Sequence, residues 1–233
     1  MKILAIDSSG LVASVALLDD DKLVGEYTIH NKKTHSQTLL PMIDAMLTMA
    51  EVPVEEVDML AVAAGPGSFT GLRIGASTAK GLAQALAIPI VPVPTLEGLA
   101  YNLQGADALV CPIMDARRNQ AYYGIYNVKN EIPEVIAEQD AAPMEEVIAK
   151  VNEQGKEVIF IGDGVPVFRE MIEKQITVPY TFGADSVRYQ KAASVAVLGK
   201  EYEKRGKAVK AAEFAPIYLR MSQAERERKE RGQ

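Results

Sequence analysis

Two short segments carry residue types that hold nucleotides in other α/β proteins. The apolar segment KILAID ends at Asp7 and is followed by Ser8 and Ser9. The end of such a strand often faces a ligand cleft. Gly65 and Gly67 lie in AAGPGSFTGLRIG, where a glycine turn leads into a helix whose first N–H groups can bind phosphate. These residues form the candidate nucleotide cleft. Strand-end capping and a sharp strand-to-helix turn are the structural alternatives.

The glycine stretch matches neither of two known phosphate-binding patterns. The dinucleotide pattern G-x-G-x-x-G requires glycine at the position of Thr70. The P-loop pattern requires a Gly-Lys pair, and here Gly71 is followed by Leu72. What remains is a helix start with Ser68 or Thr70 as the N-cap residue.

Residues that usually carry nucleophilic or metal chemistry are sparse. His30 and His35 have no carboxylate or cysteine at ligand spacing, which argues against a zinc site. No G-x-S-x-G segment supplies a serine nucleophile, and Cys111 lies in an apolar segment typical of a packed strand. We therefore assign no catalytic residue and no metal ligand, and we expect no tightly bound cofactor.

A charged cluster lies in the second half of the chain, in the segment MDARRNQAYYG. Asp115, Arg117 and Arg118 fall between two strand-like segments. They are a candidate anion-binding site, and a charge cluster in a hairpin turn is the structural alternative.

Length and composition limit the class of protein. The chain has 233 residues, 48% of them hydrophobic and 24% charged, which is enough for one large domain or two small ones. Its net charge of -6 argues against binding nucleic acid or an anionic membrane by itself. A single cysteine fits a reducing compartment, and neither a signal peptide nor a membrane-length apolar run is present. We expect a soluble cytoplasmic protein without a membrane partner.

The hydrophobic pattern of the first half predicts strands and helices in a fixed order. Residues 13–18 and 23–29 read as a hairpin after the first strand. The expected elements are strands 2–7, 13–18 and 23–29, helix 36–50, strand 57–65, helix 71–86 and strand 88–93.

The second half repeats this order. Its expected elements are strands 108–116, 120–128 and 134–139, helix 144–155, strand 157–162 and helix 165–174. A duplicated strand-strand-strand-helix-strand-helix order predicts two related α/β lobes with a cleft between them.

The domain boundaries follow from this duplication. We expect an N-terminal lobe at 1–103, a smaller C-terminal lobe at 104–186, and a late helix at 187–207 that packs back on the first lobe. Residues 208–233 are expected to be an extended segment followed by a charged tail. Residues 222–233 carry charges of both signs, so a basic RNA-binding tail and a loosely helical terminus both remain open.

Two helices of the first half carry apolar and small residues on more than one face. Helix 36–50 is apolar over about half its circumference. Small residues recur every four positions from Gly71 to Ala87, although a glycine inside a helix costs about 1 kcal/mol relative to alanine. This ridge either packs on the protein's own sheet or lets a second helix approach closely.

We expect the surplus apolar surface, including Met42, Met46 and Met49, to be exposed in a monomer and to form an association face. Methionine suits a surface that must fit more than one partner. The predicted interface residues are Leu39, Met42, Ile43, Met46, Met49, Gly71, Leu72, Ile74, Gly75, Thr78 and Ala79.

Six motifs together resemble those of one bacterial family. They are KILAIDSS, THSQTLLP, AAGPGSFTGLRIG, PVPTLEGLA, MDARRNQAYYG and PIYLR. From residue 2 to about residue 220 the chain resembles the TsaB family, also called YeaZ-like. The resemblance implies two RNase-H-like lobes, the second one reduced, as in the acetate kinase, Hsp70 and actin group. It also makes the cleft at Asp7 and Gly65 a vestigial nucleotide site.

The resemblance implies a function in making N6-threonylcarbamoyladenosine in tRNA. Similar proteins are non-catalytic subunits that form homodimers and pair with the catalytic paralogue TsaD. The ATPase TsaE and the tRNA then join through the complex, and TsaC or its relative supplies threonylcarbamoyl-adenylate. The paralogue binds metal through H-x-x-x-H. In VPTLEGLAYN of this chain, Thr95 and Leu99 stand where the histidines would be, and neither can replace an imidazole ligand.

Two enzyme hypotheses remain as alternatives. One is a glycopeptidase-like metallopeptidase, which the missing histidine pair disfavours. The other is an ATP-dependent phosphotransferase of the same fold group, because Asp7, Ser8 and Ser9 could still meet a nucleotide. A third hypothesis, direct tRNA binding by this chain alone, is disfavoured by the net charge of -6.

Overall fold

The first lobe is built on a five-stranded mixed sheet with strand order β3-β2-β1-β4-β5. The computed structural model describes residues 1–31 and 33–220. β1 runs antiparallel to β2 and parallel to β4. The strands are β1 Lys2–Asp7, β2 Ala13–Asp19, β3 Lys22–Ile29, β4 Met59–Ala63 and β5 Ile90–Val93. β1 and β4 are central and covered on both faces, which explains their almost unbroken apolar sequences.

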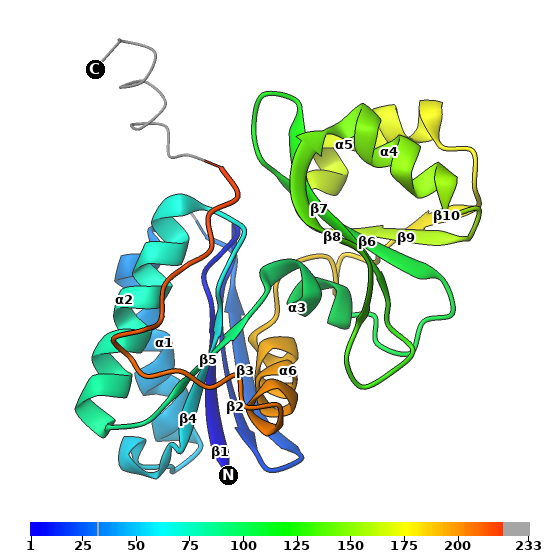
Figure 1. Cartoon of the computed structure of the whole chain (residues 1–233). Helices are drawn as coiled ribbons and strands as arrows, with labels where there is room; N and C mark the ends of the chain where they lie inside the picture. The colour runs from blue at the N-terminus through cyan, green and yellow to red at the C-terminus, as the bar shows by residue number, and fades with distance from the viewer. Residues whose placement is uncertain (32, 221–233) are drawn as a thin grey trace.

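The second lobe repeats this topology with strand order β10-β9-β6-β7-β8. β6 runs antiparallel to β7 and parallel to β9, as β1 does to β2 and β4. The strands are β6 Leu109–Asp115, β7 Gln120–Asn127, β8 Glu134–Pro143, β9 Val158–Ile161 and the short β10 Tyr180–Phe182. The expected fold of two related α/β lobes, shown side by side in Figure 1, is therefore confirmed.

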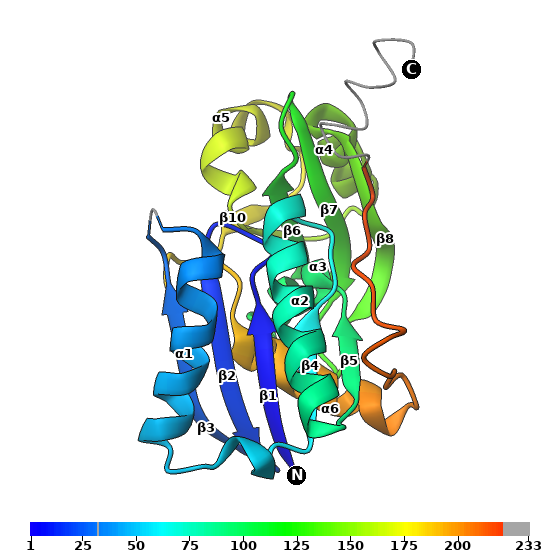
Figure 2. The same cartoon turned by 90° about the vertical axis from the view of Figure 1, so that its left-hand side faces the viewer.

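Helices cover both faces of each sheet. On the first sheet, α1 and α2 cover one face and α6 covers the other (Figure 2). On the second sheet, α4 and α5 cover one face and α3 covers the other. The helices are α1 His35–Met49, α2 Phe69–Leu86, α3 Thr95–Tyr101, α4 Met144–Glu153, α5 Gly164–Gln175 and α6 Ala192–Lys204, with a 3-10 turn at Val54–Glu56.

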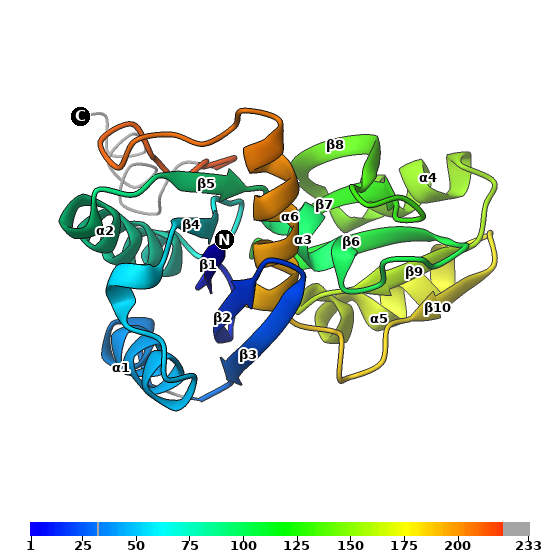
Figure 3. The same ribbon diagram turned by 90° about the horizontal axis from the view of Figure 1, so that it is seen from below.

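The last helix of each half packs on the sheet of the other half. α3 follows β5 of the first lobe but packs on β6 and β7, whereas α6 follows β10 and packs on β1, β2, β4 and β5. Figure 3 shows both helices between the two sheets. The late helix thus lies on the first lobe, where the sequence analysis placed it, but α3 and β10 had not been assigned from the sequence.

The C-terminal segment 208–220 packs on the first lobe. Val209 pairs with Ile90 of β5, and the buried ring of Phe214 joins the core between the sheet and α2. Lys80 on α2 donates to the Phe214 carbonyl at 2.9 Å, and Ile217 N–H donates to the Ala64 carbonyl at 2.7 Å. The segment therefore lies alongside α2 and reaches the space between the lobes (Figure 1). The charged tail at 222–233 lies outside the described residues.

Candidate functional site: the cleft between the lobes

Asp7 ends β1, and its carboxylate is turned back onto its own chain. The side chain is 2% exposed, and Oδ1 accepts hydrogen bonds from the Ser9 backbone N–H at 2.8 Å and from Ser9 Oγ at 2.6 Å. Burial raises the pKa of Asp7 to about 6, and the two hydrogen bonds from Ser9 oppose that rise. This is the strand-end cap that the sequence analysis held as the alternative.

The glycine turn packs directly on this cap. Ser68 N–H donates to the Ser9 carbonyl at 2.7 Å, and Ser8 Oγ donates to the Gly71 carbonyl at 2.8 Å. A Cβ atom at Gly67 would overlap the Ser9 carbonyl, and one at Gly71 would overlap the Ser8 carbonyl. The glycines are thus required for close approach of two backbones within one lobe. The structure brings the candidate cleft residues together, and their nucleotide role stays a prediction.

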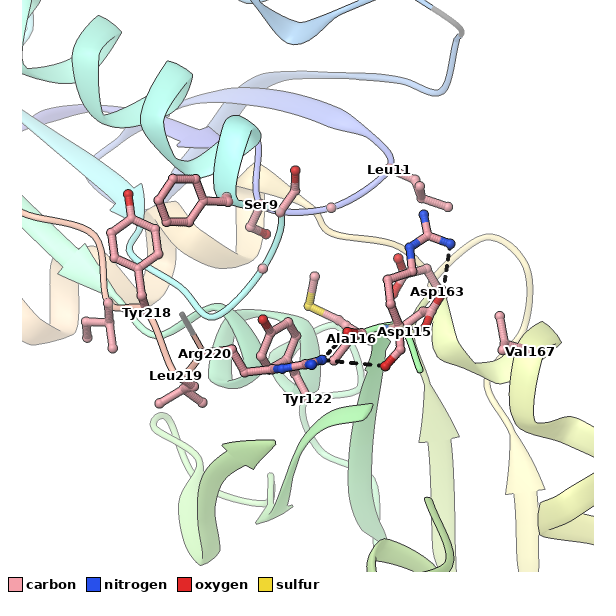
Figure 4. Close-up of a pocket in the computed structure, with 17 residues that line it drawn as sticks. Ser9, Leu11, Asp115, Ala116, Tyr122, Asp163, Val167, Tyr218, Leu219 and Arg220 are labelled. Carbon is pink, nitrogen blue, oxygen red and sulfur yellow. Dashed lines mark hydrogen bonds and ion pairs between the residues drawn. The ribbon is translucent and has the colours of Figure 1, made fainter. Parts of the chain in front are cut away.

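A cavity of about 530 Å³ lies between the two lobes (Figure 4). The first lobe contributes Ser9 and the N-terminal end of α2, and the C-terminal segment contributes Tyr218. The second lobe contributes Asp115 and Asp163. Of the candidate cleft residues, only Ser9 and Gly67 are among those that line this cavity.

Asp163 is a cavity residue that the sequence analysis missed. It follows β9, and its Oδ1 is buried without a hydrogen-bond partner among the described residues. Burial raises its pKa to about 6. A signal was available, because IGDG follows β9 as AGPG follows the equivalent strand β4. Gly65 and Gly162 take the same place and have φ values of +115° and +111°.

The turn between β6 and β7 holds the charged cluster seen in the sequence. Asp115 Oδ1 accepts the Arg117 backbone N–H at 2.7 Å, and its Oδ2 lies 3.1 Å from the Arg117 guanidinium. Arg220 from the C-terminal segment donates to the Ala116 carbonyl, so this turn contacts a residue about one hundred positions later in the sequence (Figure 4). Asp115 and Arg117 line the cavity, whereas Arg118 does not.

Most of the predicted interface residues belong to the core of the first lobe. The expectation that Met42 and Met46 are exposed in a monomer is wrong, because α1 packs them against the sheet. The buried members are Leu39, Met42, Ile43, Met46, Gly71, Leu72, Gly75 and Ala79.

Three members of the predicted interface remain accessible on the outer side. Met49 is 77% exposed, and Ile74 and Thr78 are half-buried. The small-residue ridge serves this chain's own packing at Gly75, where a Cβ atom would overlap Ser8 Oγ. An interface on the outer face of α1 and α2 therefore stays a prediction, with fewer residues.

Thr95 and Leu99 are both engaged in packing. Thr95 is fully buried, and its Oγ1 accepts the Gly65 backbone N–H at 3.0 Å. Leu99 is buried among residues of the second lobe. Of the two histidines, His35 Nε2 contacts the Gly10 carbonyl at 3.0 Å and His30 contacts the ring of Tyr189. Within residues 1–31 and 33–220, no three His, Cys, Asp or Glu side chains are grouped to hold a metal ion.

None of the helices in the described part of the chain is long and apolar enough to cross a bilayer.

The duplicated topology, the exchanged helices and the cavity between the lobes define the RNase-H-like two-lobed class. Component A of (R)-2-hydroxyglutaryl-CoA dehydratase from Acidaminococcus fermentans shares this fold. Its crystal structure matches 87% of this chain and 99% of that chain with a TM-score of 0.50 and 12% identity.

Closer relatives narrow the class to one family. The chain is 36% identical over 225 residues to the tRNA threonylcarbamoyladenosine biosynthesis protein TsaB of Bacillus subtilis, covering 97% of this chain and 96% of that protein. It is 33% identical to the TsaB protein of Haemophilus influenzae, covering 94% of each. The structure of YeaZ from Pseudomonas aeruginosa matches with a TM-score of 0.81 and 30% identity, covering 94% of this chain and 99% of that chain.

The family model described as TsaD, tRNA N6-adenosine threonylcarbamoyltransferase, matches residues 22–228. The chain belongs to the TsaB family, which is related to TsaD.

Proposed function

We propose that this chain is a non-catalytic subunit of a complex that makes N6-threonylcarbamoyladenosine in tRNA. Its likeness to proteins described as tRNA threonylcarbamoyladenosine biosynthesis proteins covers nearly the full length of both chains, which supports this function. The single cysteine supports a cytoplasmic location.

One observation carries the non-catalytic assignment. Thr95 and Leu99 stand where the resemblance puts the paralogue's two histidines, and both are used for packing. Thr95 fastens the Gly65 turn, and Leu99 lies in the contact between α3 and the second sheet. A pair of imidazoles at these positions would break both contacts. We therefore propose that the chain acts without a tightly bound metal or cofactor.

We further propose that the chain forms a homodimer and pairs with the catalytic paralogue TsaD through the outer face of α1 and α2. Leu40 is 55% exposed there, and Met49 is 77% exposed. Methionine and leucine on an accessible helix face adapt to more than one partner surface. TsaE and tRNA are proposed to join through the complex.

Light scattering on a size-exclusion column tests this pairing. The chain alone is expected to run at twice its mass of 25.3 kDa. Adding the TsaD paralogue from the same bacterium should give a new species that contains both chains. A chain that stays monomeric and never shifts with the paralogue would contradict the proposal.

The phosphotransferase alternative keeps one supporting observation, the cavity that Asp115 and Asp163 line between the lobes. Calorimetric titration with ATP and magnesium tests it. Saturable binding at micromolar concentration, lost in Asp163→Asn, would favour that alternative over the non-catalytic function.

A further inference from the structure

Four arginines lie in or next to the segments that line the cavity, although the chain as a whole has a net charge of -6. Arg117 and Arg118 lie in the turn between β6 and β7, and the Arg117 side chain is 82% exposed. Arg220 ends the C-terminal segment beside this turn, and its guanidinium contacts the Ala116 carbonyl. Arg73 lies near the start of α2 on the first lobe. Both lobes therefore contribute positively charged side chains to this rim of the cavity.

The described negative groups near this rim pair with Arg117 but leave Arg118 without an ion pair. Asp115 pairs with Arg117, and Asp163 lies inside the cavity wall. Glu145 is occupied by the amide of Asn119. Among the described residues, no group lies within hydrogen-bond or ion-pair distance of the Arg118 guanidinium. It is therefore available to an external anion.

The backbone gives a second reason to look at this turn. Arg117, Arg118 and Asn119 have φ values of +66°, +56° and +59°. Glycine and asparagine tolerate this left-handed region, whereas arginine adopts it rarely. The turn conformation therefore explains Asn119 but not the two arginines. Residues held in such conformations cluster at functional sites.

Aromatic rings continue the rim on the other side of the cavity mouth. Tyr218 is 39% exposed, and its ring centroid lies 4.5 Å from that of Phe69 with a 34° tilt. The Arg73 guanidinium lies 4.0 Å from the Phe69 centroid. Both aromatic residues line the cavity. Exposed aromatic rings beside guanidinium groups are what proteins use to stack unpaired bases and to follow a phosphodiester backbone.

We propose that this rim, formed by Phe69, Arg73, Arg117, Arg118 and Tyr218, is a docking surface for unpaired nucleotides of RNA. The inference rests on the proposed function, because that function brings tRNA to the complex. The guanidinium groups meet phosphates, and Tyr218 stacks on a base. An acidic protein segment would use the arginines but leave the aromatic pair without a role. The net negative charge of the chain keeps this contact weak until a partner subunit supplies further contacts.

Fluorescence anisotropy with a labelled tRNA transcript tests this surface, using the complex of this chain with the TsaD paralogue. Arg118→Gln should weaken binding several-fold and lower the slope of log affinity against log salt by about 0.7–0.9, the value for one phosphate contact. Tyr218→Ala should weaken binding about tenfold with little change in slope, whereas Tyr218→Phe should bind normally. The control is Arg205→Gln at the exposed C-terminal end of α6, which should change neither quantity.

Normal affinity and slope in both Arg118→Gln and Tyr218→Ala would overturn the proposal. So would an equal loss in Arg205→Gln, since that would indicate charge alone. If these variants bind RNA normally but no longer capture an acidic protein, the rim is a site for a protein partner instead. Circular dichroism and column elution report folding and pairing for each sample. If the unmodified chain does not pair with the paralogue, the proposed function fails, and anisotropy of the chain alone at low salt still decides this inference.

Discussion

Thr95 makes two hydrogen bonds to the backbone of Gly65. Its N–H donates to the Gly65 carbonyl at 2.9 Å, and its Oγ1 accepts the Gly65 N–H at 3.0 Å. Thr95 begins α3, which packs on the second sheet, whereas Gly65 begins the glycine turn of the first lobe. This pair therefore links the start of α3 to the glycine turn of the first lobe. Thr95 also stands at the position where the resemblance places a metal-binding histidine of the catalytic paralogue.

The first prediction concerns the hydrogen bond from the Gly65 N–H to Thr95 Oγ1. Thr95→Val keeps the shape of the side chain but leaves the buried Gly65 N–H without an acceptor. It should lower the free energy of unfolding by about 1–3 kcal/mol. Thr95→Ser keeps the hydroxyl and should cost less. Urea denaturation measures both variants, and a valine variant as stable as the serine variant would contradict the role of the hydroxyl.

Two glycines of α2 form a matched pair for the second prediction. A Cβ atom at Gly71 would overlap the Ser8 carbonyl, whereas one at Gly81 would meet no atom within 4 Å. Gly81→Ala should therefore stabilise the protein by up to about 1 kcal/mol through helix propensity. Gly71→Ala should destabilise it by about 1–3 kcal/mol through overpacking. Thermal unfolding of the two variants checks the sign of each change, and the same sign in both would refute this account of the ridge.

A third prediction tests the outer face of α1. Met49→Asp places a charge on a side chain that is 77% exposed, so the monomer should stay folded. Homodimer formation and pairing with the TsaD paralogue should both weaken at least tenfold. Ile136→Asp on β8 of the second lobe is the control, because Ile136 is also exposed but lies away from α1. Light scattering distinguishes them, and equal effects from the two variants would place the association face elsewhere.

The fourth prediction concerns pH. Burial raises the pKa of Asp163 from its usual 3.8 to about 6. Between these values the folded chain holds a proton that the unfolded chain has lost, so this stabilisation is full below pH 4 and is lost as pH rises through 6. Asp163→Asn cannot ionise. Relative to the parent it should gain up to about 3 kcal/mol between pH 4 and pH 7. Chemical denaturation at a series of pH values measures this gain, and a difference that does not change with pH would contradict it.

The order of strands and helices could be predicted from the sequence because each element carries its own hydrophobic period. The buried strands β1 and β4 and the alternation of elements made the duplication visible. The short helix α3 and the three-residue strand β10 are too short to show a period, so they were not assigned.

What covers an apolar face could not be predicted from periodicity. Met42 and Met46 were expected on the surface, but the sheet covers them because α1 lies flat against it. Gly75 was expected to meet another chain, but it meets Ser8 of its own lobe. A larger side chain at Gly75 would therefore disturb the lobe itself.

The cavity depends on how the lobes sit against each other. The exchange of α3 and α6 sets this placement, and that exchange involves contacts between residues far apart in the chain. The sequence could therefore show that Asp163 follows a strand equivalent to β4, but not that it lines the same cavity as Ser9. The turn at Arg117 was flagged from its residue types, but the nearby C-terminal residue Arg220 was not, because only the folded chain brings them together.

Reconstituted tRNA modification tests the central claim most directly. The chain, the TsaD paralogue, TsaE and threonylcarbamoyl-adenylate are mixed with ATP and an unmodified tRNA, and each protein is left out in turn. Nucleoside analysis by mass spectrometry reports N6-threonylcarbamoyladenosine. We predict no product from this chain alone, full product from the complete mixture, and a large loss when this chain is omitted. Product formed by this chain without the paralogue, or full product without this chain, would contradict its function as a non-catalytic subunit.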